Sequence, residues 1–144
     1  MKLWLQTATL VLAVLVLALV LGAQQNPPPA PAPAPQAPTQ KVPPEAAQKP
    51  NPVRPTAESL AKGKKTYVID CALCHGENGD GKNDMDMKNV PDLTNPEVQK
   101  SATDGQWFYV IRHGIGDMPA EGTDRAKDEE VWNIVNYVRS FGKK

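Results

Sequence analysis

The sequence has few of the residues that bind metals or carry out redox chemistry. Of its 144 residues, only two are cysteine and two are histidine. The charged side chains cancel, with 16 lysines and arginines against 16 aspartates and glutamates. Because a neutral chain has no field that attracts phosphates, we expect no nucleic-acid partner. No stretch alternates apolar and polar residues as a half-buried strand does, which favours an all-α fold.

The beginning of the chain lacks charge. After Lys2, no residue from Leu3 to Ala23 is charged, and as a helix these 21 residues would be about 31 Å long, enough to cross a bilayer. We expect residues 1–23 to be a transmembrane anchor with Lys2 on the cytoplasmic side. A cleaved signal peptide is the alternative, although Leu21 is large for the −3 position of its cleavage site. The rest of the chain is then either anchored with its folded part in the periplasm or another extracytoplasmic space, or a soluble periplasmic protein.

A segment rich in proline and alanine follows. Twelve of the 15 prolines lie between Pro27 and Pro55. Since proline has no N–H and a fixed φ, we expect residues 24–55 to form an extended polyproline II linker that enters no helix or sheet. Residues 56–144 are the predicted folded domain. A domain of this size buries little apolar surface, so a cofactor or a covalent staple is expected.

Three helices are predicted in this domain. The first is capped by Thr56 and runs to about Asp70. One face of this helix carries residues spaced three or four apart, namely Leu60, Gly63, Tyr67 and Cys71. The second covers about 104–113 and is ended by Gly114. The third lies within 128–141 and has an apolar face made of Val131, Ile134, Val135, Val138 and Phe141.

Both cysteines lie in one short motif, Cys71-Ala72-Leu73-Cys74-His75. A zinc site would need His113 as its fourth ligand, and His75 directly after Cys74 is poorly placed to share a tetrahedral centre. A redox dithiol usually follows a strand, and none is predicted here. The third possibility, a haem bound through two thioethers with His75 as proximal ligand, suits the spacing and would supply the missing apolar core. We therefore favour covalent haem.

A second axial ligand to such a haem would come from a methionine or the other histidine. Met118 lies in a loop between two predicted helices and is followed by the stiff Pro119. Met85 and Met87 lie in a polar loop, and His113 ends the second helix. We favour Met118 and keep the other three as alternatives.

Taken together, the motifs of residues 56–144 resemble the class I cytochromes c, the small monohaem bacterial type. Four segments carry the resemblance: the Gly63, Tyr67 and Cys71 spacing, "CALCHG", "PDL" from Pro91 to Leu93, and "GIGDMPA" around Met118. The resemblance implies one haem c attached through Cys71 and Cys74, with His75 and Met118 as iron ligands. It also implies that the Pro91 carbonyl accepts the Nδ1 proton of His75, and that Ile134 and Tyr137 pack against Gly63.

The resemblance implies a one-electron carrier rather than an enzyme. Its donor would be a quinol-oxidising complex or a dehydrogenase, and its acceptor a terminal oxidase or a photosynthetic reaction centre. The alternative is a fixed haem c subunit of a larger membrane oxidoreductase complex. The long linker favours the mobile carrier, because a fixed subunit needs no reach.

Overall fold

The computed structural model describes residues 42–83, 85 and 87–143. Their elements, in chain order, are α2 (Pro44–Ala47), α3 (Ala57–Asp70), α4 (Ala72–His75), α5 (Pro96–Lys100), α6 (Asp104–His113) and α7 (Asp128–Phe141). The described residues contain no strand, only an isolated bridge between Ile115 and Met118. No helix within these residues has the length and apolar character to cross a bilayer. The predicted anchor, residues 3–23, lies outside the described residues.

The three predicted helices are confirmed, and their ends follow local capping rules. Thr56 caps α3 by accepting a hydrogen bond from Ser59 N. A capping box between Thr103 and Gln106 begins α6, and Gly114 with φ 73° ends it. Helix α7 starts at Asp128, where the Glu130 side chain accepts a hydrogen bond from Lys127 N. Helices α2, α4 and α5 have four or five residues each and were not predicted from the sequence.

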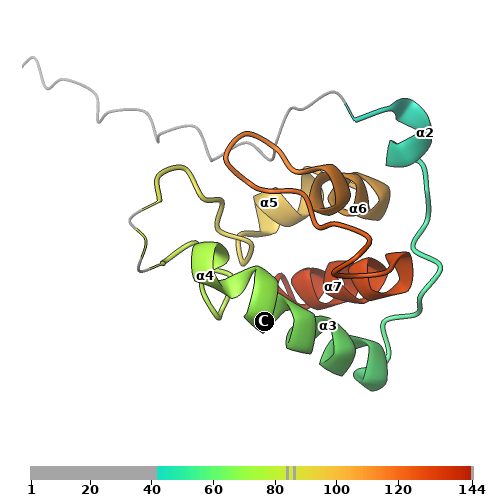
Figure 1. The fold of residues 1–144 in the computed structure, drawn as a ribbon, viewed down its shortest axis with the longest axis horizontal. Helices are drawn as coiled ribbons and strands as arrows, with labels where there is room; N and C mark the ends of the chain where they lie inside the picture. Colours follow the sequence, from blue (N-terminus) through green and yellow to red (C-terminus); the bar gives the residue numbers. More distant parts are fainter. Residues whose placement is uncertain (1–41, 84, 86, 144) are drawn as a thin grey trace, which may run out of the picture. The chain divides into compact units, whose positions relative to one another are not determined.

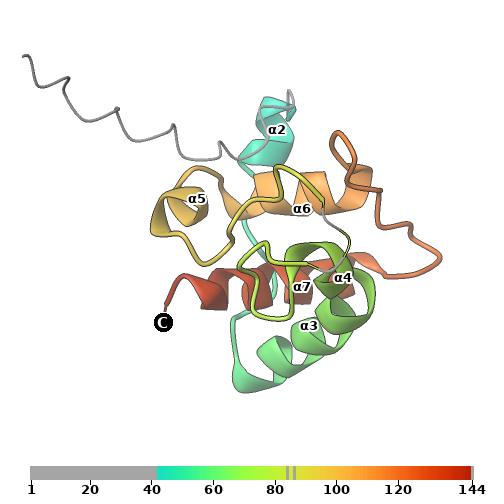
Figure 2. The ribbon, with the colours of Figure 1, turned by 90° about the vertical axis from the view of Figure 1, so that its left-hand side faces the viewer.

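Helix α7 is the centre of the fold. It packs against α3 and against α6, and both views show it between these two helices (Figures 1 and 2). All five residues of its predicted apolar face are buried, each contributing about 1.5–3 kcal/mol by leaving water. They share one core with residues of the other elements, including Tyr67, Leu93, Val98, Trp107, Ile111, Ala126 and Trp132.

The contact between α3 and α7 is made at Gly63, with one change from the prediction. A Cβ at Gly63 would lie 2.0 Å from the carbonyl oxygen of Asn133 and 2.9 Å from Tyr137 Cβ. Tyr137 is therefore at the crossing as predicted, whereas Asn133, not Ile134, supplies the nearest backbone. Ile134 points into the core, where it is 1% exposed.

The expectation that residues 24–55 enter no helix is wrong for Pro44–Ala47, which form α2. Pro44 occupies the first turn, where a missing N–H costs nothing. Residues 42–55, here called the strap, pack on the domain, with α2 against α6. Thr103 Oγ1 donates to Ala47 O, and a Cβ at Gly105 would lie 2.1 Å from Ala46 O.

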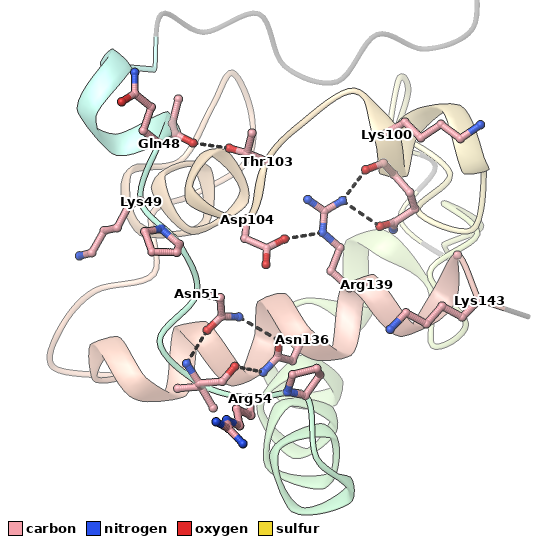
Figure 3. A pocket seen from close by; sticks show the side chains of 16 residues that line it. Gln48, Lys49, Asn51, Arg54, Lys100, Thr103, Asp104, Asn136, Arg139 and Lys143 are labelled. Carbon is pink, nitrogen blue, oxygen red and sulfur yellow. Dashed lines mark hydrogen bonds and ion pairs between the residues drawn. The ribbon is translucent and has the colours of Figure 1, made fainter.

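Beyond α2, one asparagine holds the strap to α7. Asn51 Nδ2 donates to Asn136 Oδ1 at 2.9 Å, and Asn136 Nδ2 donates to Val53 O (Figure 3). Asn136 Nδ2 also donates to Ser59 Oγ of α3. A groove of about 880 Å³ lies between the strap and the ends of α5, α6 and α7. It contains none of the predicted haem-binding residues. Its central cation, Arg139, is already bonded to Asp104.

Candidate haem site

The two cysteines and His75 lie where α3 gives way to the single turn α4. Cys71 leaves the regular helix at φ −120°, although its N–H still bonds to Tyr67 O. The turn ends at Gly76, whose φ of 76° is disfavoured for other residues. The Tyr67 hydroxyl donates to Gly76 O at 2.9 Å. This bond ties the end of the motif to the buried face of α3.

A cleft of about 370 Å³ opens beside this motif. One side presents Cys71, Cys74 and His75, and the loop around Met118 lines it as well. Apolar side chains of α6 and the loops on either side complete the lining, including Val90, Trp107, Val110, Ile111, Ile115 and Pro119. The structure thus brings both thiols, one imidazole and the Met118 thioether to a single largely apolar cleft, which Met87 also lines.

Met118 is placed by a tight backbone turn. Ile115 N donates to Met118 O at 3.0 Å, and Met118 N donates to Ile115 O at 2.9 Å. Gly114 enters this turn with positive φ, and a Cβ there would lie 2.5 Å from Met118 O. Any other residue at position 114 would therefore strain the turn and move the methionine.

The other candidate ligands differ in their positions. Met87 also lines the cleft, so it remains a competitor of Met118. Met85 does not line it and is 54% exposed. His113 is exposed, stacks on Tyr109 and has its Nδ1 2.9 Å from Tyr109 O. The structure therefore does not bring Met85 or His113 to the cleft.

The predicted hydrogen bond between His75 and Pro91 is absent from the structure. His75 Nδ1 is buried and has no hydrogen-bond partner, although Pro91 lines the same cleft. Burial lowers the pKa of His75, which keeps the imidazole in the neutral form that binds metals. The pairing of Nδ1 with the Pro91 carbonyl stays a prediction.

The environment of Cys71 argues against a redox dithiol. Burial, assisted by the charges of Asp70 and Glu121, raises the pKa of Cys71 to about 12. Reactive dithiols need the opposite, a thiolate stabilised near neutral pH. A zinc site is not supported either, because no group of three or more His, Cys, Asp or Glu side chains in the described part of the chain could hold a metal ion.

Four further residues of the cleft do not stand out in the sequence. Trp107 is 6% exposed, and its indole Nε1 is buried without a partner. Glu121 is 8% exposed, and Arg125 and Asp70 also line the cleft. The Arg125 guanidinium donates to the carboxylate of Asp70, at the end of α3. Long-range ion pairs of this kind leave no periodic signal in a sequence.

The cleft fits a haem c. It has two thiols for the vinyl groups, an imidazole with a buried Nδ1 and apolar walls, and the unpartnered Trp107 Nε1 offers a hydrogen-bond donor to a polar group of a cofactor. An all-α domain with this attachment motif and a methionine loop defines the protein as a class I monohaem cytochrome c. Its cofactor is a covalent haem c.

The family can be stated more closely. Residues 58–138 match the family described as cytochrome c oxidase, cbb3-type, subunit III, and the chain belongs to that family. The match begins within α3 and ends within α7, so it spans the attachment motif, Met118 and the helix contact at Gly63.

Individual relatives agree with this assignment. The cbb3-type cytochrome c oxidase subunit FixP of Azorhizobium caulinodans is 32% identical over 91 residues, which are 56% of this chain and 27% of that protein. Subunit CcoP of Rubrivivax gelatinosus is 28% identical over 85 residues, 58% of this chain and 26% of that one. Cytochrome c6 of Cladophora glomerata is 34% identical over 83 residues, 57% of this chain and 88% of the relative. The chain therefore spans less than a third of the oxidase subunits it matches and most of the cytochrome c6.

Proposed function

We propose that this protein is a haem c electron-transfer subunit of a larger membrane oxidoreductase complex, of the kind to which cbb3-type oxidase subunits belong. The supporting observation is the cleft that collects Cys71, Cys74, His75 and Met118 from distant parts of the chain. The family match favours the subunit over the free carrier that the linker suggested.

The residues of the cleft have separate roles in this proposal. Cys71 and Cys74 would attach the haem through their thiols, and His75 and Met118 would bind its iron. The bound haem c supplies reversible one-electron chemistry, and ligation by histidine and methionine raises its reduction potential. If His75 and Met118 both bind the iron, they would leave no site on it for a substrate, and we therefore propose electron transfer as the function. The apolar walls from α6 keep water from the cofactor and so sharpen the effect of nearby charges.

The uncharged segment at residues 3–23 suggests where in the cell the domain lies. We propose that residues 3–23 anchor it in the cytoplasmic membrane, with the haem domain in the periplasm. Because residues 42–55 pack on the domain, the free part of the tether would be residues 24–41, about 56 Å when extended as polyproline II. Such a tether confines the domain near its partners and raises their effective concentration. The donor would be a quinol-oxidising complex or a dehydrogenase, and the acceptor a terminal oxidase.

A mobile carrier is the second candidate. It is favoured by the match to cytochrome c6, a relative of nearly the same size as the domain. The two readings differ in stoichiometry. Purification of the full chain from its own membranes should yield a one-to-one complex with oxidase subunits if it is a subunit, and an isolated haem protein if it is a carrier.

An absorption spectrum of the membranes tests the shared part of both readings. We expect a c-type α-band on reduction and a haem that stays with the protein after extraction with acidic acetone. Loss of the haem into the solvent would refute covalent attachment.

A further inference from the structure

Glu121 is a buried carboxyl group in the haem cleft that the proposed function does not use. It lies three residues after Met118, directly after the methionine loop (residues 114–120), and its backbone N–H donates to Ile111 O at 2.8 Å. Only 8% of the residue is exposed, and its Oε1 atom is buried without a hydrogen-bond partner. A buried carboxylate oxygen without a hydrogen bond is costly, so the charges around Glu121 decide its protonation.

The cations near Glu121 are shared with other carboxylates. Arg125 Nε lies 3.4 Å from Glu121 Oε1, but the same guanidinium donates to Asp70. Arg112 donates to the backbone oxygens of Glu121 and Ala126 and, through Nη2, to the Asp128 carboxylate. Two arginines thus face three carboxylates, and Glu121 has the weakest pairing of the three.

Burial and the surrounding charges together raise the pKa of Glu121. Burial raises the pKa of Glu121 above its ordinary value of 4.5, and the charges of Asp70 and Asp124 raise it further. Arg125 and Arg112 act in the opposite direction. A carboxyl held in this balance responds to any change of charge in the same cleft.

We propose that Glu121 is the proton-binding partner of the haem, taking up one proton from solvent when the haem is reduced and releasing it on oxidation. The inference rests on the proposed function, because it requires a haem c in the cleft. One electron from a one-electron redox protein converts ferric to ferrous iron, and one proton converts the Glu121 carboxylate to the acid. Only the new O–H bond is formed, and the charge of the cleft is conserved.

The physical reason is electrostatic. Reduction removes one positive charge from the cofactor, so the carboxylate loses attraction and its protonated form becomes more favourable. At pH values between the pKa of Glu121 in the oxidised protein and its pKa in the reduced protein, uptake of an electron is linked to uptake of a proton. Within that pH window, the equilibrium constant for reduction falls by up to tenfold for each unit by which pH rises.

The test is the reduction potential of the full-length holoprotein, titrated from about pH 4 to about pH 9. We expect the unmodified protein to show the pH-dependent window and Glu121→Gln to lose it. Glu129→Gln is the matched control, because Glu129 is exposed in the first turn of α7. An equal dependence in Glu121→Gln would assign the proton to the haem propionates and overturn the proposal.

Two further variants keep the test decisive if Glu121→Gln folds poorly. Asp70→Asn removes a negative neighbour and frees Arg125 for Glu121, so it should move the window to lower pH. Arg125→Gln removes the nearest cation and should move the window to higher pH. If the pH window stays in place in both variants, Glu121 is not the group that binds the proton.

An infrared difference spectrum between the two redox states supplies a second readout. Within the window, reduction should produce the carbonyl band of a protonated carboxyl group, and Glu121→Gln should lack it. The failure of this inference is distinguishable from failure of the proposed function. A protein without covalent haem refutes the function, whereas a haem protein with an unchanged pH dependence refutes only the role of Glu121.

Discussion

Gly63 of α3 lies so close to Asn133 of α7 that a Cβ at Gly63 would come within 2.0 Å of the Asn133 carbonyl oxygen. The neighbour is backbone, so no side chain can rotate away. The two helices would have to separate to admit even one methyl group, and the core around Tyr67 and α7 depends on their contact.

We therefore expect Gly63→Val to lower the free energy of unfolding by about 1–3 kcal/mol, the usual cost of overpacking. Denaturant titration of the holoprotein measures it. Ala61→Val is the control, because Ala61 is exposed on the same helix and should cost less than about 1 kcal/mol. Equal midpoints for Gly63→Val and the unmodified protein would mean that α3 and α7 do not meet at this glycine.

A second prediction concerns the hydrogen bond between Asn51 of the strap and Asn136 of α7. Asn51→Ala removes the amide that donates to Asn136 Oδ1. Because Asn136 is only 5% exposed, its oxygen is left without this donor in a buried position, and the free energy of unfolding should fall by about 1–3 kcal/mol. Gln48→Ala, at an exposed position of the same segment, should cost almost nothing. If the two variants unfold at the same denaturant concentration, the strap is not held by Asn51.

Met118→Ala should abolish the weak far-red charge-transfer band of the oxidised haem protein and open the iron to external ligands. Met85→Ala is the control, since Met85 is exposed outside the cleft. Met87 lines the cleft, so Met87→Ala decides between the two methionines. Loss of the band in Met87→Ala, with the band retained in Met118→Ala, would reverse the ligand assignment.

Cys71→Ala and Cys74→Ala should each prevent stable attachment of the haem. We expect the double variant to lose its fold, because the cleft is lined by apolar side chains that the haem would cover. Circular dichroism and the retention of haem in denaturing solvent measure the two effects. A well-folded, haem-free double variant would show that the core is sufficient by itself.

The raised pKa of Glu121 also leads us to expect a dependence of stability on pH. Its pKa is raised in the folded state, so the unfolded chain loses this proton at a lower pH than the folded protein does. The contribution of Glu121 is therefore fully present below about pH 4.5 and is lost as pH rises through the folded pKa. Glu121→Gln should gain stability relative to the unmodified protein over that range, as measured by denaturant midpoints at several pH values. A constant difference between the two proteins would show that Glu121 does not titrate on unfolding.

The sequence by itself determined the local structure and the chemistry of attachment. Helices α3, α6 and α7 follow from caps and from apolar spacing, both of which depend on residues within one or two turns. The attachment motif needs only five consecutive residues, and these bring Cys71, Cys74 and His75 to one turn whatever surrounds them. Haem c and the all-α class could therefore be predicted without coordinates.

Tertiary structure decided everything that depends on distant parts of the chain meeting. The packing of residues 42–55 on α6 and α7 depends on the fit of Gly105 and Asn136, which no local pattern reports. The backbone of Asn133 rather than the side chain of Ile134 meets Gly63 because the rotation of α7 is fixed by its whole buried face. The charge balance at Glu121 likewise exists only where the end of α3, α6 and the methionine loop converge, since electrostatic interactions depend on distance in space and not along the chain.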